Sequence, residues 1–132
     1  MRRKEREQRG YNLILRKKGF GGNRFPGFKQ CMKMMRQHDP QVQEDGFYWL
    51  KCHANEYLDQ LIAELNVEEK PGLRGWLLEL IGEARSPLAF PLLVEYLHGT
   101  DEMLRDWAVF GLKNLDSKEA RRILWEAGLK DA

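Results

Sequence analysis

The sequence predicts an all-α protein, a short right-handed α-solenoid of about three helical hairpins with an N-terminal helical cap. Two observations support this class: a repeat of 31 residues runs along most of the chain, and apolar residues within it recur at helical spacing. A hairpin this short cannot bury its own apolar stripe, so neighbouring hairpins are expected to stack. No strand pattern accompanies them.

Residues 1–38 are expected to form a basic helical cap interrupted by a glycine-rich connector. Breakers in the stretch GFGGNRFPG separate a helix over about 3–16 from a second helix over about 26–37. Three interpretations of the connector stand. Its aromatic side chains pack on the first hairpin, or they stack in a nucleic-acid contact, or they meet a second protein. These aromatic residues are Phe20, Phe25 and Phe28.

The repeat is visible where LRGW at 73–76 returns as LRDW at 104–107, a shift of 31 residues. The same shift pairs Ser86 with Ser117 and Leu93 with Leu124. Three copies fit the chain, and they span about 39–69, 70–100 and 101–132.

The middle copy contains the signals of two helices. Its first apolar stripe consists of Leu73, Leu77, Leu80, Ile81 and Ala84. A break follows at Arg85, after which Ser86 is a good N-cap and Pro87 suits a first helical turn. The second stripe consists of Leu88, Leu92, Leu93, Tyr96 and Leu97, before a stop at Gly99. Each copy is therefore predicted to be a helical hairpin.

LRGWLLELIGEARSPLAFPLLVEYL and LRDWAVFGLKNLDSKEARRIL resemble HEAT repeats of the short, phycobilisome-lyase-like type. The residues that carry the resemblance are Arg74, Ala89, Pro91, Leu92 and Arg105, and it covers about residues 39–128. The first copy departs from the pattern, with Val42-Gln43 where the family has an apolar residue followed by arginine. The family serves many unrelated binding tasks, so the motifs specify fold better than function.

A helical wheel of residues 73–84 places Gly75, Glu79 and Glu83 opposite the apolar stripe, with Trp76 at its border. In the HEAT family the corresponding positions line the concave binding face. That resemblance implies a partner-binding face made of Glu44, Asp45, Tyr48, Trp76, Glu79, Glu83, Met103, Asp106, Trp107, Phe110 and Asn114, beside Cys52.

Phe110 and Tyr48 replace the glutamate of the middle copy, and exposed aromatics among acidic residues are typical of an interface centre. Trp76 and Trp107 fit this face or a sideways position in the core equally well. The acidic neighbours favour a basic partner.

Charge is distributed unevenly along the chain. Residues 1–36 hold 12 Lys/Arg and 2 Glu, whereas residues 37–132 hold 10 basic and 18 acidic residues. The basic arm predicts a solvated segment, a contact with the chain's own acidic body, or a contact with nucleic acid. The candidate nucleic-acid contacts are Arg2, Arg3, Lys4, Arg16, Lys17, Lys18 and Arg24.

The sequence lacks the motifs of common catalytic, cofactor-binding and metal-binding sites. No nucleophile with its base, P-loop or dinucleotide fingerprint can be assembled, so we expect no catalysis and no cofactor. The spacing of Cys31, His38, Cys52 and His53 matches no common zinc pattern, so we expect no metal and no disulfide. His98 at a helix end is expected to cap carbonyls. A chain without a long apolar run or a signal peptide is expected to be cytoplasmic, and monomeric when unbound.

Together these patterns predict a non-catalytic protein-binding module. The family resemblance suggests an immunity protein that neutralises a cognate bacterial toxin through an acidic-aromatic concave face. The alternatives are a nucleic-acid-associated adaptor that uses the basic arm, and a lyase-like or enzyme-accessory HEAT protein. Acidity of the concave face argues against a DNA glycosylase of the HEAT-like type, because acidic residues repel phosphate.

Overall fold

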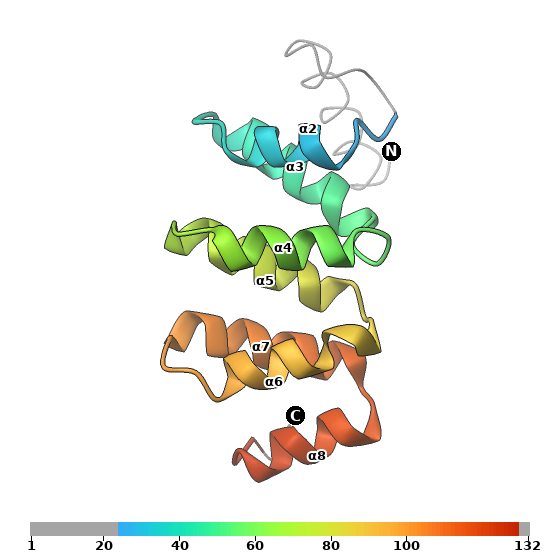
Figure 1. The fold of residues 1–132 in the computed structure, drawn as a ribbon, viewed down its shortest axis with the longest axis vertical. Helices are drawn as coiled ribbons and strands as arrows, with labels where there is room; N and C mark the ends of the chain where they lie inside the picture. The colour runs from blue at the N-terminus through green and yellow to red at the C-terminus, as the bar shows by residue number, and fades with distance from the viewer. Residues whose placement is uncertain (1–23, 130–132) are drawn as a thin grey trace, which may run out of the picture. The chain divides into compact units, whose positions relative to one another are not determined.

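The computed structural model describes residues 24–129, and all regular structure in this range is helical. It contains seven α-helices and one 3₁₀ turn, and no strand occurs among the described residues (Figure 1). The all-α prediction is therefore confirmed at this level. The helix expected over about 3–16 lies outside the described residues, as do Arg2, Arg3, Lys4, Arg16, Lys17, Lys18 and Phe20.

The chain divides into two compact units, Met1–Cys52 and His53–Ala132. The division separates the first predicted copy of the repeat into two parts, so each unit is considered by itself. The first contains α2 (Phe28–Met35) and α3 (Pro40–Cys52). The second contains α4 (Leu58–Val67), α5 (Pro71–Glu83), η1 (Pro87–Ala89), α6 (Phe90–Leu97), α7 (Glu102–Leu115) and α8 (Lys118–Glu126). Within the described residues, no helix is both long and apolar enough to cross a membrane.

In the first unit, α2 packs against α3 at a glycine. A Cβ atom on Gly46 would lie 2.7 Å from the Cys31 carbonyl oxygen and 2.8 Å from Met34 Cβ, closer than real side chains approach. The α2 side chains turned inward are Cys31, Met32, Met34 and Met35, all buried. The second helix of the predicted cap is thus present, although it is shorter than the range 26–37.

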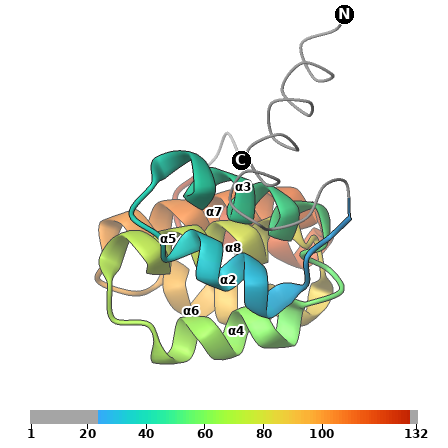
Figure 2. The same ribbon diagram turned by 90° about the horizontal axis from the view of Figure 1, so that it is seen from above.

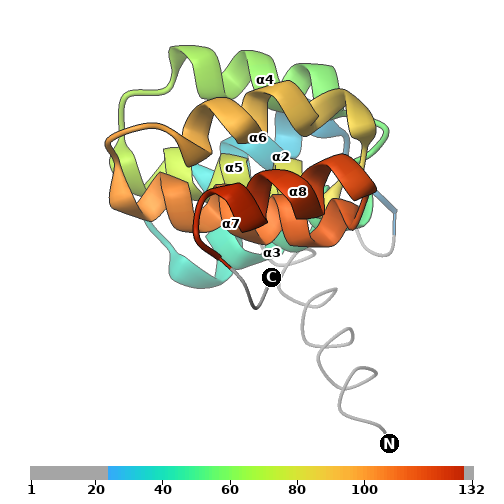
Figure 3. The same cartoon turned by 90° about the horizontal axis from the view of Figure 1, so that it is seen from below.

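In the second unit, α4 and α6 lie on one side and α5 and α7 on the other (Figures 2 and 3). α7 packs along both α5 and α6, and α5 packs against α4, while α8 follows beside α7. α5 is the most enclosed helix, since Leu77, Leu78, Leu80 and Ile81 are all fully buried.

Two details of the predicted hairpins are wrong. α5 has no extended contact with α6 in the described structure; it packs instead on α4 and α7, the helices of the neighbouring copies. Buried leucines and isoleucine on several sides of α5 explain this, because one partner helix could not cover them. Leu88 does not join the second stripe, since it lies in η1 and is 76% exposed. Leu93 and Leu97 are buried as expected.

The period of 31 residues governs where the helices begin. α3, α5 and α7 start at Pro40, Pro71 and Glu102. The residues after α5 and α7 repeat at the same interval: Arg85 and Asp116 both adopt a left-handed backbone, with φ of 49° and 48°. Sequence similarity between the copies therefore corresponds to similar helix boundaries.

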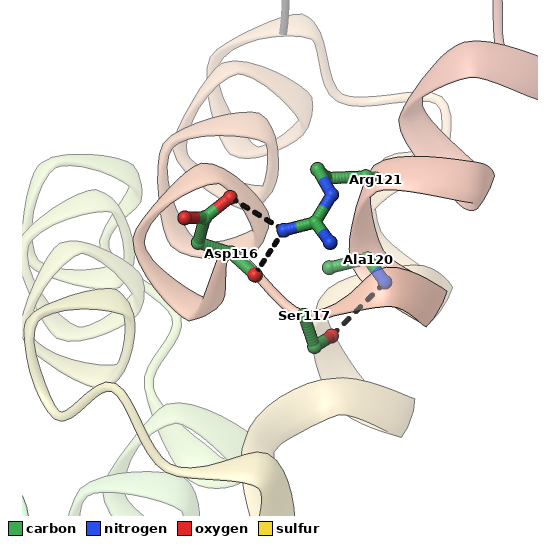
Figure 4. A network of polar contacts seen from close by, with 4 residues as sticks. All are labelled: Asp116, Ser117, Ala120 and Arg121. Atoms are coloured by element: carbon green, nitrogen blue, oxygen red, sulfur yellow. Dashed lines mark hydrogen bonds and ion pairs between the residues drawn. The ribbon is translucent and has the colours of Figure 1, made fainter.

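The N-caps predicted from sequence also repeat. Ser86 Oγ accepts a hydrogen bond from the Leu88 amide at 3.2 Å, which confirms its capping role. Ser117 Oγ accepts from the Ala120 amide at 3.1 Å (Figure 4). At the same corner Arg121 Nη1 donates to Asp116 Oδ1 at 2.9 Å and to the Asp116 carbonyl. Side chains thus satisfy backbone groups that helix ends leave unpaired.

Arg74, one of the residues of the repeat motif, joins three elements of the second unit. Its Nη1 donates to the carbonyl oxygens of Leu65 at 3.0 Å and Glu68 at 2.8 Å, just beyond α4. Its Nη2 donates to the Tyr96 hydroxyl on α6 at 2.8 Å. A planar guanidinium with five donors can make all three contacts at once, which a lysine cannot.

Candidate protein-binding surface

The structure brings predicted partner-binding residues together along α5 and α7. We define the α5–α7 face as Trp76, Glu79, Glu83, Met103, Asp106, Trp107, Phe110 and Asn114. The first three come from α5 and the remainder from α7, and both helices belong to the second unit.

Glycines allow the two helices to approach closely beneath this face. A Cβ on Gly82 would lie 2.9 Å from Gly111 Cα and 3.1 Å from a ring carbon of Phe110. A Cβ on Gly75 would lie 3.0 Å from Met103 Cε. Side chains from α7 therefore reach across the glycines of α5, and the prediction that Gly75 is exposed is wrong, because these side chains cover it.

Two aromatic rings form the centre of the α5–α7 face. Trp107 and Phe110 have ring centroids 5.5 Å apart and planes at 86°, an edge-to-face arrangement. Such pairs add about 0.5–1.5 kcal/mol to the stabilisation from burial. Both rings are half-buried, so each packs against the protein and still offers a surface to solvent. This corrects the expectation that Phe110 is an exposed ring.

Exposure varies across the rest of the face. Met103 is 38% exposed and Asp106 is also exposed, whereas Trp76, Glu79 and Glu83 are half-buried. Asn114 is half-buried, and its Nδ2 donates to the Gly82 carbonyl at 3.3 Å, so it joins α7 to α5. This contact gives Asn114 a structural role that the sequence did not predict.

The first unit holds the other predicted site residues, on α3. Glu44 and Cys52 are exposed, and Tyr48 is 43% exposed, as the wheel predicted. Asp45 is completely buried, so its predicted place on an exposed arc is wrong. The adjacent Gly46 brings α2 within backbone contact, and this close approach explains how a residue on that side of α3 becomes enclosed.

Burial changes the acidity of Asp45. The pKa of its carboxyl is raised to about 6, mainly by loss of hydration; a hydrogen bond from Gln41 opposes this rise, and the nearby charges of Glu44 and Asp39 add to it. Gln41 Nε2 donates to Oδ1 at 3.1 Å. Oδ2 is buried and has no hydrogen-bond partner in the described part of the chain. The carboxyl is therefore a cost to folding at neutral pH.

Cationic residues on α2 make a surface that the sequence prediction left out. Lys29 and Lys33 are exposed one turn apart, and Arg36 follows at the helix end. Of the candidate nucleic-acid contacts predicted from the sequence, Arg24 is exposed, but Lys29, Lys33 and Arg36 are not among those candidates. The sequence contained a signal for this surface, because Lys29, Lys33 and Arg36 have the spacing i, i+4, i+7 that places residues on one side of a helix.

The cysteines and histidines occupy separate environments. Cys31 is buried, which raises the pKa of its thiol to about 12, and Cys52 is exposed at the end of α3. Among the described residues, no three side chains of the types His, Cys, Asp and Glu gather as a metal site would require. His98 Nδ1 lies 3.0 Å from the Val94 carbonyl oxygen, in agreement with the predicted cap.

Comparison with known proteins returned no match: no family model, no curated protein and no solved structure is significantly similar to this chain.

Proposed function

We propose that this chain is a non-catalytic protein-binding module of stacked HEAT-like repeats, and that the α5–α7 face takes a partner with a basic surface. The repeated helix starts and corner geometry support the repeat assignment. The observation that carries the binding role is the Trp107–Phe110 pair, whose rings are half-buried and so keep part of their aromatic surface accessible.

The chemistry of this face selects its partner. Interfaces are anchored by large aromatic residues at their centre, with polar or charged residues at the rim. Here Asp106 is on α7 with the aromatic pair, Glu79 and Glu83 are on the neighbouring α5, and residues 53–129 hold 14 acidic against 8 basic residues. An acidic field accelerates the encounter with a basic protein and disfavours a nucleic acid.

Within this proposal, toxin neutralisation is the specific form that the resemblance to HEAT-type immunity proteins suggests. A basic surface around a nuclease active site would be covered sterically and by charge. The chain would then need no catalytic group of its own, because blocking a surface requires only affinity.

The test is affinity capture followed by direct binding, with matched variants. Wild-type protein and Trp125→Ala should retain the same partner from native cells, because Trp125 is 60% exposed on α8 and is not one of the residues that define the α5–α7 face. Phe110→Ala should weaken binding of the purified partner about 30-fold or more, equivalent to about 2 kcal/mol at a central anchor. Asp106→Lys should reduce the association rate, and added salt should diminish that difference.

Neutralisation requires a separate measurement. The purified partner's activity should fall in proportion to the bound fraction when wild-type protein is added, and Phe110→Ala should shift the required concentration by the same factor as the affinity. A partner that binds both α5–α7 variants as tightly as the wild type would place the interface elsewhere. A bound pigment or a turnover of substrate would support the accessory or enzyme alternatives instead.

A further inference from the structure

The exposed side of α2 is a row of cations. Lys29, Lys33 and Arg36 fall within one narrow arc of the helix, since their spacing is i, i+4 and i+7, and all three are exposed. The opposite side carries the buried cysteine and methionines that pack on α3. No acidic residue occurs in the sequence between Arg24 and His38.

Part of this row opposes the folding of the helix. Like charges one turn apart destabilise a helix by about 0.2–0.5 kcal/mol per pair. Lys29 also lies in the first turn, where the helix dipole disfavours a cation. Within the described residues, neither Lys29 nor Lys33 has an ion pair that would offset this cost. The helix dipole favours Lys33 in the last turn, so the cost comes from Lys29 and from its repulsion with Lys33. A ligand explains a cation kept at position 29 more easily than stability does.

The geometry fits a chain of phosphates. Seven residues of α-helix advance about 10 Å, and one strand of duplex nucleic acid advances about 10 Å over three base steps. The three charges of the row therefore span about the same axial length as four phosphates of one strand. We propose that the α2 row, defined as Lys29, Lys33 and Arg36, binds the sugar-phosphate backbone of nucleic acid without reading its sequence.

Nucleic acid is favoured over an acidic protein surface because its charges are regular and linear, as the α2 row is. The proposal concerns different residues from the α5–α7 face. It goes beyond the proposed protein-binding function, and either surface can be present without the other.

The experiment measures binding of the full chain to a short labelled duplex of mixed sequence by fluorescence anisotropy across a salt series. The Lys29→Ala/Lys33→Ala double variant should lower the slope of log K against log salt by about 1.8, because each lost phosphate contact removes about 0.9. Affinity at low salt should fall several-fold or more with it. The matched control is Lys113→Ala/Lys118→Ala, which removes two exposed lysines of the second unit and should leave the slope unchanged.

Circular dichroism should show equal helix content in the wild type and both variants, since alanine favours helix at exposed positions. An unchanged slope and affinity in the Lys29→Ala/Lys33→Ala variant would overturn the proposal. Competition by polyglutamate as effective as that by nucleic acid, at equal total charge, would also overturn it, because the row would then bind any polyanion. Capture of the protein partner by the α5–α7 face should be unaffected by this variant, so the two proposals fail separately.

Discussion

Two helix crossings in this molecule use glycine in different ways. Where α2 meets α3, a Cβ on Gly46 would meet a backbone carbonyl oxygen at 2.7 Å. Where α5 meets α7, a Cβ on Gly75 would meet the flexible end of Met103 at 3.0 Å. The first crossing encloses the carboxylate of Asp45, whereas the second supports a half-buried aromatic surface.

This difference shows that a glycine contact changes the environment of its neighbours. Backbone contact at Gly46 is rigid, so the residue beside it is buried whatever its polarity. At Gly75 the contact is made by the flexible Met103 side chain, whereas at Gly82 an added Cβ would also meet backbone, the Gly111 Cα, beside the Phe110 ring. The comparison predicts that an added methyl group costs more stability at Gly46 than at Gly75, where the Met103 side chain can move aside.

The largest loss of stability should come from a substitution in the core of the second unit, and the changes at the two crossings are compared with it. Leu93 is buried beside Gly111, where an added Cβ would lie 2.7 Å from its Cδ2. Leu93→Ala should lower the free energy of unfolding by roughly 2–5 kcal/mol, through lost burial and the cavity left behind. Leu88→Ala, at a residue that is 76% exposed, should change it by less than about 0.5 kcal/mol. Urea denaturation measures both, and equal losses would mean that η1 is packed differently from this description.

Gly46→Ala tests the rigid crossing directly. The added methyl must displace the α2 backbone, so we expect a loss of roughly 2–3 kcal/mol, at the upper part of the range for overpacking. Gly72→Ala is the control, because nothing lies within 4 Å of its added Cβ, and it should be neutral or stabilise by up to about 1 kcal/mol. Thermal unfolding of both variants distinguishes the effects. A stable Gly46→Ala protein would show that α2 can move away from α3 at little cost.

The sequence predicted the helical class and the corners well, for a physical reason. Helix starts, N-caps and breaks depend on a few neighbouring residues, so Ser86 and the break at Arg85 could be located without tertiary information. The helices that pack against α5 could not be predicted in this way. Its apolar residues occupy several sides, and a helical wheel does not say which helix covers each side.

The candidate site was predictable only in part. A helical wheel correctly placed Tyr48 and Glu44 at the surface, but it assigned Asp45 to the same arc because it contains no neighbouring helix. It also missed that Asn114 donates to the α5 backbone, a contact between residues 32 positions apart. The sequence of one helix shows which of its residues share a side. It does not show which side another helix will cover, because that depends on tertiary packing.

Asp45 offers a pH test of the first crossing. Because burial raises the pKa of this carboxyl to about 6 in the folded chain, the folded state holds its proton more tightly than the unfolded state does. Its contribution to stability is therefore greatest below about pH 4 and is lost as pH rises through about 6. Asp45→Asn should raise the free energy of unfolding by about 2 kcal/mol at pH 8, less than the full shift implies because the new amide is buried without an acceptor.

The pH series is what identifies the cause. The stabilisation by Asp45→Asn, measured by urea unfolding, should diminish from pH 8 to pH 4, since the wild-type carboxyl becomes neutral there. Glu44→Gln is the control, because Glu44 is exposed on the same helix and should show a much smaller dependence. A stabilisation that is independent of pH would indicate a packing effect and not an ionisation.

Apart from the control variants, Phe110→Ala should have the smallest effect on stability, and it tests the α5–α7 crossing. The ring is half-buried against Gly82 and the edge of Trp107, so truncation removes part of its burial and one aromatic pair. We expect a loss of about 1–1.5 kcal/mol, well below the roughly 3–5 kcal/mol of a core phenylalanine. Phe110→Leu should recover part of the stability, because leucine restores apolar contact with the glycine but not the edge-to-face geometry. If Phe110→Ala instead unfolds the second unit, the ring belongs to the core, and a binding face centred on it would lose its main support.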